Sequence, residues 1–406
     1  MMGESPKSAQ FQMIWSRLEA RKWLSHGFVS ELTGVEKQPQ EGQNGTVKYK
    51  VFGSRWNIGG IAPPDDLDLK ELLDTATDYY DIYVLGFQEI VPLNARNVLG
   101  PKQRSAATRW DALIGDALNN RRRRHDTMAP QRQWRQDDEE FRCVMSEQMV
   151  GILVSVWARS GLRRHVRHTG ASRIGAGVLG RLGNKGAVSV RFLLHGTSFC
   201  FVCCHLASGG EDGDALRRNA DAAGIVSRTS FSGRRDGLTQ EELQLPRKIF
   251  DHDRMVLLGD LNYRVAIDGA EALQLVRARK WGMLLGNDEL LLELSRGRRF
   301  DGWREGLVTF APTYKYKPNS EWFYWRTDDD SAIAGHQKQH RAPAWCHRIL
   351  WRGKGMRQTR YESCRGYRLS DHRPVRAVFH AVCEVAEGVD SKMVKHADIL
   401  CSEMVS

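Results

Sequence analysis

The chain has 406 residues, 41% of them hydrophobic, so it can bury the core of one large domain or two ordinary ones. Its net charge of +11 favours an anionic partner, which can be nucleic acid, a negatively charged membrane surface or a phosphorylated small molecule. No apolar run approaches the ~20 residues of a membrane span, and the first residues lack a secretory signal pattern, so we expect a soluble protein of the cytoplasm. The 8 cysteines are too few for a disulfide scaffold and are expected to be reduced structural thiols.

The polar lead 1–45 and the mixed tail 383–406 flank the region 46–382, which we expect to be one domain. Strand-like apolar runs recur at 48–52, 81–87, 149–158, 186–194, 199–204, 255–258 and 375–382. Helical patterns fall at 65–80, 105–119, 212–227 and 271–285, and polar loops at 119–142, 228–242 and 326–341. Because strands dominate and helices fall in blocks, the pattern predicts an α+β fold with two adjacent sheets.

Polar side chains end several of these strands. The run 255–258 leads to Asp260 and Asn262, which strand alternation places on the same side, although a Gly-Asp turn is the plainer interpretation of this segment alone. The other strand ends carry Asn57, the pair Gln88-Glu89, His205, and the pair Asp371-His372. Side chains at rigid strand ends are well placed to form a site, so five such endings predict one.

Nine segments, in the same order along about 46–382, resemble the inositol polyphosphate 5-phosphatases. They lie at 56–60, 86–93, 183–186, 204–206, 259–264, 311–316, 341–346, 348–351 and 370–374. The segments 61–64 and 94–98 look most like the plant type I branch of that family. The resemblance implies the DNase I-like fold, a two-sheet β-sandwich flanked by helices in four α/β/β/α layers.

The resemblance also implies a Mg²⁺-dependent site at the edge of the sandwich. Glu89 matches the main Mg²⁺ ligand, with Asn57 beside it, and Asp260 matches the residue that orients and deprotonates the attacking water. Independently of the family, a hard cation on oxygen ligands neutralises phosphoryl charge, and a carboxylate can accept a proton from water. A thiol-phosphate route would need a phosphate loop between Cys346 and Arg352, but that segment lacks glycine and has the pattern of a strand.

Other matched positions face the phosphate or the rest of the substrate. Asn262 matches the residue that holds phosphoryl oxygens, His205 and His372 match histidines that contact the scissile phosphate, and Asp371 is the neighbouring carboxylate. Matched substrate-binding positions are Tyr314 and Lys315, which are expected to contact the adjacent phosphate, together with Asn184, Lys185 and Arg341.

One position departs from the family pattern. His347 stands where the family carries an aspartate that hydrogen-bonds the histidine of Ser-Asp-His, which is His372 here. An imidazole cannot replace that carboxylate, so loss of the partner should lower the pKa of His372 and loosen its ring. By analogy with serine proteases, this loss costs on the order of 10⁴ in rate. A slow enzyme, a weakly active phosphoinositide-binding relative and a tolerated substitution all remain open. A second departure, Gln339 in place of a basic residue, leaves substrate preference open.

The sequence is compatible with three candidate functions. The first is Mg²⁺-dependent removal of the 5-phosphate from phosphatidylinositol 4,5-bisphosphate, its 3,4,5-trisphosphate relative or soluble inositol phosphates. The second is a non-catalytic phosphoinositide-binding module, and the third is a DNA nuclease of the same fold, against which the segments 311–316 and 341–346 argue. We therefore expect no nucleic-acid partner, and the sequence predicts no oligomeric state. The aromatic cluster 322–325 can be a packed loop or a patch that seats the protein at a membrane.

Overall fold

The computed structural model describes residues 45–385 except 77, 79, 95, 98–104, 126–139, 178–181, 232–243, 298–299 and 325–341. The lead up to residue 44 and the tail from 386 therefore lie outside the described residues, as does the polar loop predicted at 326–341. In the described part, no helix is both long and apolar enough to cross a lipid bilayer.

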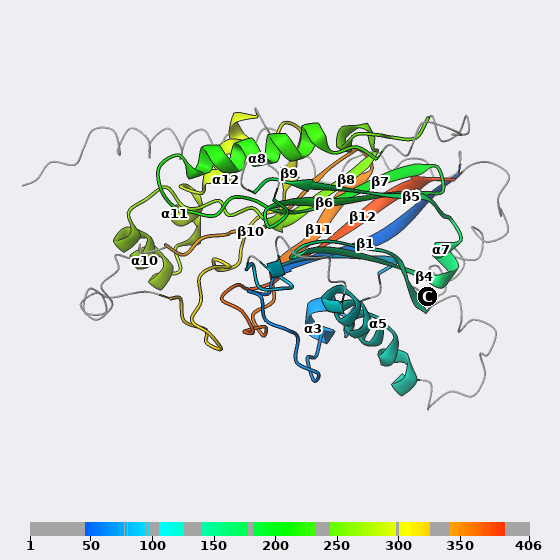
Figure 1. Ribbon diagram of the computed structural model, residues 1–406, viewed down its shortest axis with the longest axis horizontal. Helices are drawn as coiled ribbons and strands as arrows, with labels where there is room; N and C mark the ends of the chain where they lie inside the picture. Colours follow the sequence, from blue (N-terminus) through cyan, green and yellow to red (C-terminus); the bar gives the residue numbers. More distant parts are fainter. Residues whose placement is uncertain are drawn as a thin grey trace, which may run out of the picture. The chain divides into compact units, whose positions relative to one another are not determined.

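Two six-stranded sheets form the centre of the fold (Figure 1). In sheet order, the first contains β11 (Met356–Ser363), β12 (Val375–Glu384), β1 (Thr46–Asn57), β2 (Ile82–Gln88), β4 (Ile152–Arg159) and β3 (Phe141–Met149). The second contains β5 (Val166–Gly175), β6 (Gly186–Leu194), β7 (Thr197–His205), β8 (Arg254–Asp260), β10 (His347–Arg352) and β9 (Arg304–Glu305). Most pairs are antiparallel, but β1 with β2 and β7 with β8 are parallel.

The two sheets face each other across a buried apolar core. Alternate residues of β1, β2 and β4 meet those of β6, β7 and β8 there, for example Val84, Val190 and Leu258. The sheets approach closely at Gly86, where an added Cβ would collide with Leu258 and Cys203. Cys203 lies in this core, whereas its neighbour Cys204 lies in the cluster on the opposite face of its sheet, as strand alternation predicts.

Helices cover the outer faces of both sheets. The first sheet carries α3 (Lys70–Leu73) and α5 (Ser105–His125), while α8 (Asp214–Arg228) and α12 (Glu289–Arg296) lie over the second (Figure 1). The remaining helices are α7 (Ser160–Arg163), the 3₁₀ turn η3 (Ile249–Asp251), α10 (Gly269–Arg277) and α11 (Trp281–Leu285). The predicted α+β sandwich with four α/β/β/α layers is therefore confirmed.

Side-chain caps determine where two of these helices begin. Asp268 accepts hydrogen bonds from the first backbone N–H groups of α10, and Asp288 accepts one from Leu291 N in α12. Helix α12 ends at Gly297, whose φ of 65° suits a residue without a Cβ.

Several predicted boundaries were wrong. The helix expected at 65–80 is only the short α3. Residues 119–125, which were expected to begin a loop, still belong to α5. The helix expected at 271–285 is two helices, because the chain turns after residue 278. The strand expected at 149–158 is the second half of a hairpin, β3 and β4.

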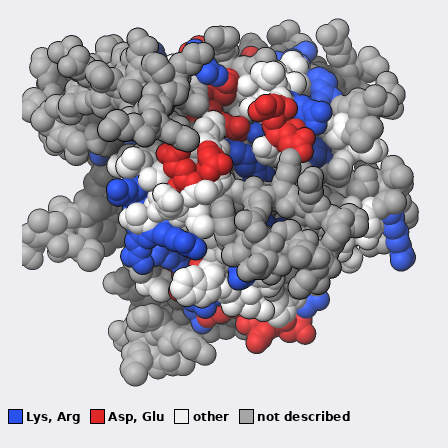
Figure 2. Space-filling model, turned by 90° about the vertical axis from the view of Figure 1, so that its left-hand side faces the viewer, with Lys and Arg blue, Asp and Glu red and all other residues white. Residues whose placement is uncertain are grey.

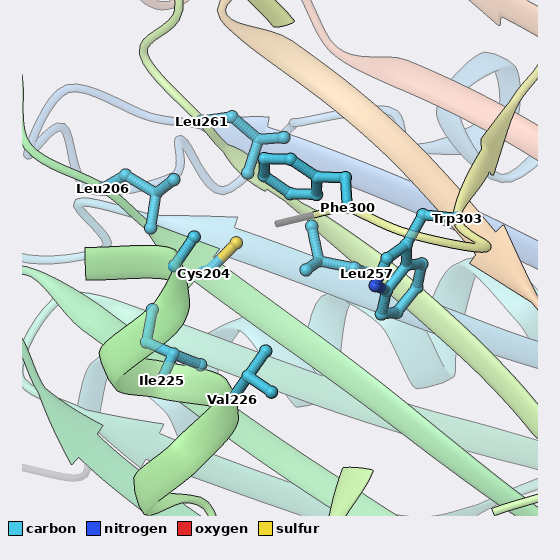
Figure 3. A pocket seen from close by; sticks show the side chains of 9 residues that line it. Cys204, Leu206, Ile225, Val226, Leu257, Leu261, Phe300 and Trp303 are labelled. Carbon is cyan, nitrogen blue, oxygen red and sulfur yellow. The ribbon is translucent and has the colours of Figure 1, made fainter. Parts of the chain in front are cut away.

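A small apolar pocket lies between α8 and the second sheet. Ile225 and Val226 of the helix face Leu257 of β8, with Phe300 and Trp303 at one side (Figure 3). Among the lining residues the only titratable group is the Cys204 thiol, whose pKa burial raises well above its usual value. This pocket therefore offers packing rather than catalysis.

Candidate active site

The parallel strand pairs bring the predicted polar residues to one end of the sandwich. In the first sheet, Asn57 at the end of β1 is paired with Gln88, directly before Glu89. In the second, His205 at the end of β7 is paired with Asp260 at the end of β8. Parallel neighbours end at the same edge of a sheet, so each sheet presents its polar ends together.

The amide of Asn57 joins the two sheets at this end. Its Nδ2 donates to Asp260 Oδ2 at 2.8 Å and to Glu89 Oε1 at 3.2 Å, while its Oδ1 accepts from Gly59 N at 3.0 Å. The carboxylates of Glu89 and Asp260 thus face one point, although their residues come from different sheets. Closely spaced oxygen ligands of this kind suit a hard divalent cation.

Two imidazoles adjoin the carboxylates. His205 Nε2 lies 3.6 Å from Asp260 Oδ2 and 3.7 Å from Glu89 Oε1, and His372 Nε2 lies 4.0 Å from Asp260 Oδ2. Lys185 Nζ lies 2.5 Å from His205 Nε2, and an ammonium group can only donate, so His205 is neutral and accepts at Nε2. The predicted residues Asn57, Glu89, His205, Asp260 and His372 therefore form one cluster.

Burial and neighbouring charges determine the protonation states at this site. Burial lowers the pKa of His205 well below its usual value and that of His372 to about 4, so both rings are neutral at pH 7. Burial also raises the pKa of Glu89 and lowers that of Lys185. For Asp260 burial acts to raise the pKa, but the surrounding cationic groups, led by the two histidines when charged, hold it well below its usual range. At neutral pH, where those rings carry no charge, Lys185 and the buried Arg55 keep Asp260 ionised.

Asn262 is held by backbone and side-chain contacts beside Asp260. Its backbone N donates to Asp260 Oδ1 at 3.2 Å, its Nδ2 donates to Leu206 O at 3.1 Å, and its Oδ1 accepts from Arg264 at 2.9 Å. Both Asn262 and Glu89 have φ of 55°, a left-handed conformation that is uncommon for non-glycine residues.

The predicted substrate-binding residues lie partly at the same place. The Tyr314 ring lies 4.4 Å from the His372 ring, and Lys315 Nζ forms an ion pair with Asp371 at 3.2 Å. Lys185 contacts His205 as above, and the adjacent Asn184 has a buried Oδ1 with no hydrogen-bond partner among the described residues. Arg341, Gln339 and Trp325 lie outside the described residues.

His347 lies under the site and packs against His372. The two rings stack with centroids 4.5 Å apart and planes 6° from parallel. His347 Nδ1 donates to the backbone O of Arg373 at 2.7 Å, so no hydrogen bond joins the two imidazoles. His372 Nδ1, the atom that would donate to an acidic partner, is buried and has no partner among the described residues.

Sequence reasoning missed three supporting residues. Arg55 is fully buried beneath the site and donates to Gln88 Oε1. Ser370 Oγ donates to Asn57 O at 2.6 Å and accepts from His372 N at 3.0 Å, so it joins β1 to the loop before β12. Arg264 stacks on Tyr314 at 4.7 Å while it donates to Asn262. A signal existed for Arg55, because it lies two residues before Asn57 in the same strand and therefore shares a strand face with it.

Comparisons with known proteins agree with this geometry. Residues 54–378 match the model of endonuclease/exonuclease/phosphatase family 2. The chain is 49% identical to the type IV inositol polyphosphate 5-phosphatase 9 of Arabidopsis thaliana, over 82% of this chain and 78% of that relative. It is 41% identical to the type I inositol polyphosphate 5-phosphatase 8 of the same plant, over 88% of this chain and 76% of that relative.

Solved structures show the same fold. The 5-phosphatase domain of SPsynaptojanin, in complex with inositol (1,4)-bisphosphate and calcium, aligns with a TM-score of 0.67 and 26% identity, over 89% of this chain and 94% of that domain. A Cimex nitrophorin aligns with a TM-score of 0.56 at 19% identity, over 82% of this chain and 98% of that one, which shows the shared fold alone. On the family model and the plant relatives together, the chain belongs to the inositol polyphosphate 5-phosphatases, a family of hydrolases.

Proposed function

We propose that the protein removes the 5-phosphate from inositol polyphosphates or phosphoinositide headgroups by direct attack of water, with Mg²⁺ as cofactor. The observation that carries this proposal is the Asn57 amide, which holds the carboxylates of Glu89 and Asp260 at one point beside two neutral imidazoles. The site combines an oxygen-ligand set for a hard cation with a buried base and neutral donors, the groups that hydrolysis of a phosphate monoester requires.

Glu89 and Asn57 are the residues that would hold the cation. The Glu89 side chain is 27% exposed, so an ion can reach it, and its buried charge lacks a direct ion pair with lysine or arginine among the described residues. When bound, Mg²⁺ supplies positive charge to the phosphoryl and leaving oxygens. The calcium and inositol (1,4)-bisphosphate of the SPsynaptojanin domain support a divalent cation and a sugar phosphate at this kind of site.

The remaining groups act on water and on phosphate. Asp260 is ionised at neutral pH and is placed to orient a water molecule and accept its proton. Asn262 and His372 are the donors proposed for phosphoryl oxygens. His205 Nε2 accepts from Lys185, so the phosphate contact expected of His205 falls to the Lys185 ammonium group beside it.

Tyr314 and Lys315 are the groups proposed to contact a second phosphate of the headgroup. They lie next to His372, where Tyr314 offers a hydroxyl and Lys315 an ammonium group. Lys315 is paired with Asp371 in the structure, so a phosphate that binds Lys315 must compete with that carboxylate.

His372 Nδ1 has no carboxylate partner among the described residues, which supports a slow enzyme, or a binding module with little turnover. His347 fills the place below that ring without a hydrogen bond to it. The His347→Asp variant should release phosphate faster than the parent. An unchanged or lower rate would show that the substitution is tolerated.

Membrane association is proposed from the exposed aromatic residues near Lys315. Trp322 is 76% exposed and Tyr324 is 43% exposed, and Lys315 Nζ lies 5.6 Å from the Tyr324 ring centre. Large exposed aromatic side chains beside cations suit the interface of an anionic bilayer at the cytoplasmic face of a membrane. Trp322→Ala should weaken binding to anionic liposomes without changing hydrolysis of soluble inositol phosphates; equal liposome binding would remove this proposal.

A phosphate-release assay tests the proposed function. Wild type should release phosphate from 5-phosphorylated headgroups with Mg²⁺ and not with chelator, and Asp260→Asn should lose at least about 10²-fold in rate.

Supercoiled plasmid, the substrate of the nuclease alternative, should remain intact. Figure 2 shows acidic and basic side chains interspersed on the face drawn, in place of the continuous basic stripe expected for a nucleic-acid groove. Tight headgroup binding without phosphate release would favour the binding module.

A further inference from the structure

Among the described residues, two buried ring nitrogens of the His347–His372 pair have no hydrogen-bond partner. His347 is fully buried and uses Nδ1 for the backbone of Arg373, which leaves the Nε2 lone pair unbonded among the described residues. His372 is 6% exposed, and its Nδ1 is also unbonded. Buried polar atoms are nearly always paired, so two unpaired imidazole nitrogens in contacting rings point to a ligand.

A carboxylate adjoins these rings. His347 on β10 is the register partner of Asp260 on β8, and strand pairing therefore sets the imidazole beside the carboxylate. Asp260, His347 and His372 each offer one ligand atom, and these three atoms all lie within 4.8 Å of one another. All three residues are buried, so a surface accumulation of acidic groups does not account for the cluster.

Two imidazoles and one carboxylate match the ligand preference of Zn²⁺ and similar transition ions rather than that of Mg²⁺. At zinc bond lengths, ligand atoms of a tetrahedral site lie about 3.3 Å apart, so ligand atoms that now lie within 4.8 Å of one another must close by up to about 1.5 Å. Because the stacked rings are 6° from parallel, one of them must also tilt out of the stack before both nitrogens can face one ion, and the His372 ring, whose Nδ1 has no hydrogen-bond partner among the described residues, is the one available to move. We propose that Asp260, His347 and His372 form a binding site for a Zn²⁺-type ion, separate from the proposed Mg²⁺ ligand Glu89.

Occupation of this site would inhibit hydrolysis. A transition ion on Asp260 takes the lone pairs that would accept the proton of water, and it fixes His372 away from phosphate. The inhibition rests on the proposed phosphatase function, but the binding does not, so a metal-binding readout separates failure of one from failure of the other.

Co²⁺ titration of the full-length protein in excess Mg²⁺ tests the binding. The ion reports a low-coordinate nitrogen and oxygen site through its visible absorption, and Zn²⁺ should displace it. Wild type should bind one Co²⁺ at this site, and His347→Phe, which keeps a stacking ring but has no ring nitrogen, should bind at least 10-fold more weakly. His347→Asp should also change the absorption spectrum, because it exchanges a nitrogen ligand for oxygen.

The matched control is His195→Phe, because His195 and His165 form another contacting pair, with ring centres 4.4 Å apart, among the described residues. This control should bind Co²⁺ as wild type does. Absence of saturable binding in wild type, or equal affinity in wild type and His347→Phe, would overturn the proposal.

Anomalous scattering from a Zn²⁺-soaked wild-type crystal needs no variant. A peak among the three side chains supports the site, and a peak found only elsewhere contradicts it. If the binding holds, Zn²⁺ should slow phosphate release by wild type by a larger factor than it slows His347→Phe, each compared with its own rate without Zn²⁺.

Discussion

Replacing Asn57 by aspartate exchanges an NH₂ group for an oxygen at the junction of the two sheets. Asn57 is 1% exposed, and its Nδ2 lies 2.8 Å from Asp260 Oδ2 and 3.2 Å from Glu89 Oε1. The Asn57→Asp variant keeps the shape of the side chain. It nevertheless loses both hydrogen bonds and places a third carboxylate about 3 Å from two others.

The expected cost follows from these contacts. Hydrogen bonds to charged groups contribute about 1.5–3 kcal/mol each. Repulsion between buried carboxylates is limited, because one of them takes up a proton, and holding a carboxyl protonated about three pH units above its ordinary pKa costs about 4 kcal/mol. Together these contributions give a loss of about 7–10 kcal/mol in the free energy of unfolding at pH 7.5 in chelator, most of a typical total of about 5–15 kcal/mol.

Urea unfolding of wild type and variant, in chelator and in millimolar Mg²⁺, measures this cost. A cation between three carboxylates replaces the lost donor, so Mg²⁺ should recover at least about 2 kcal/mol of the deficit. The control is Asn219→Asp, a buried asparagine whose Oδ1 already accepts from Tyr263 at 2.5 Å, and its deficit should not depend on Mg²⁺. A deficit of Asn57→Asp that is equal in chelator and Mg²⁺ would refute the metal assignment.

Three further perturbations test the scaffold. Arg348 is fully buried and donates to Asp288 at 2.7 Å and to Glu305 at 2.6 Å. Because Arg348→Met leaves two buried carboxylates unpaired, it should lower the free energy of unfolding, measured in urea, by about 3–5 kcal/mol. A loss below about 1 kcal/mol would contradict this expectation. Gly86→Ala forces a Cβ into the facing sheet and should cost about 1–3 kcal/mol, measured the same way, with slower phosphate release because the two halves of the site separate. Burial lowers the pKa of His252 below 6.5, so as pH falls below 6.5 the unfolded chain takes up a proton before the folded chain does, and stability is lost. The free energy of unfolding should fall less between pH 7.5 and pH 5 in His252→Gln than in wild type, and equal falls would contradict the assignment.

Much of the site was predictable because its residues follow short apolar strands directly in sequence. Asp260 comes straight after a buried run, and the parallel pairing of β7 with β8 then brings His205 beside it. The two sheets and the cluster of Asn57, Glu89 and His372 follow from the same pattern.

Other features depend on contacts that one segment cannot reveal. The strands β5 and β11 consist mostly of half-buried and exposed residues and carry exposed arginines, so no apolar run in the sequence predicts them. The pattern at 65–80 carries good helix-starting residues, but the helix stops at Asp74, which adopts a left-handed conformation with φ of 54°. Its buried carboxylate accepts from Arg360, a contact that the segment alone cannot reveal. The stacking of His347 on His372 requires the register of β10 against β8, which the sequence does not give.

The most direct test of the central claim is the identity of the product. Inositol 1,4,5-trisphosphate is incubated with wild type or Asp260→Asn, with and without Mg²⁺, and phosphorus NMR follows each ring phosphate separately. Membership of the 5-phosphatase family predicts that wild type with Mg²⁺ removes the 5-phosphate alone. The convergence of Asn57, Glu89 and Asp260 on one point predicts that Asp260→Asn leaves the substrate intact over the same time. Loss of a different phosphate, or equal loss of the 5-phosphate with and without Asp260, would contradict the account.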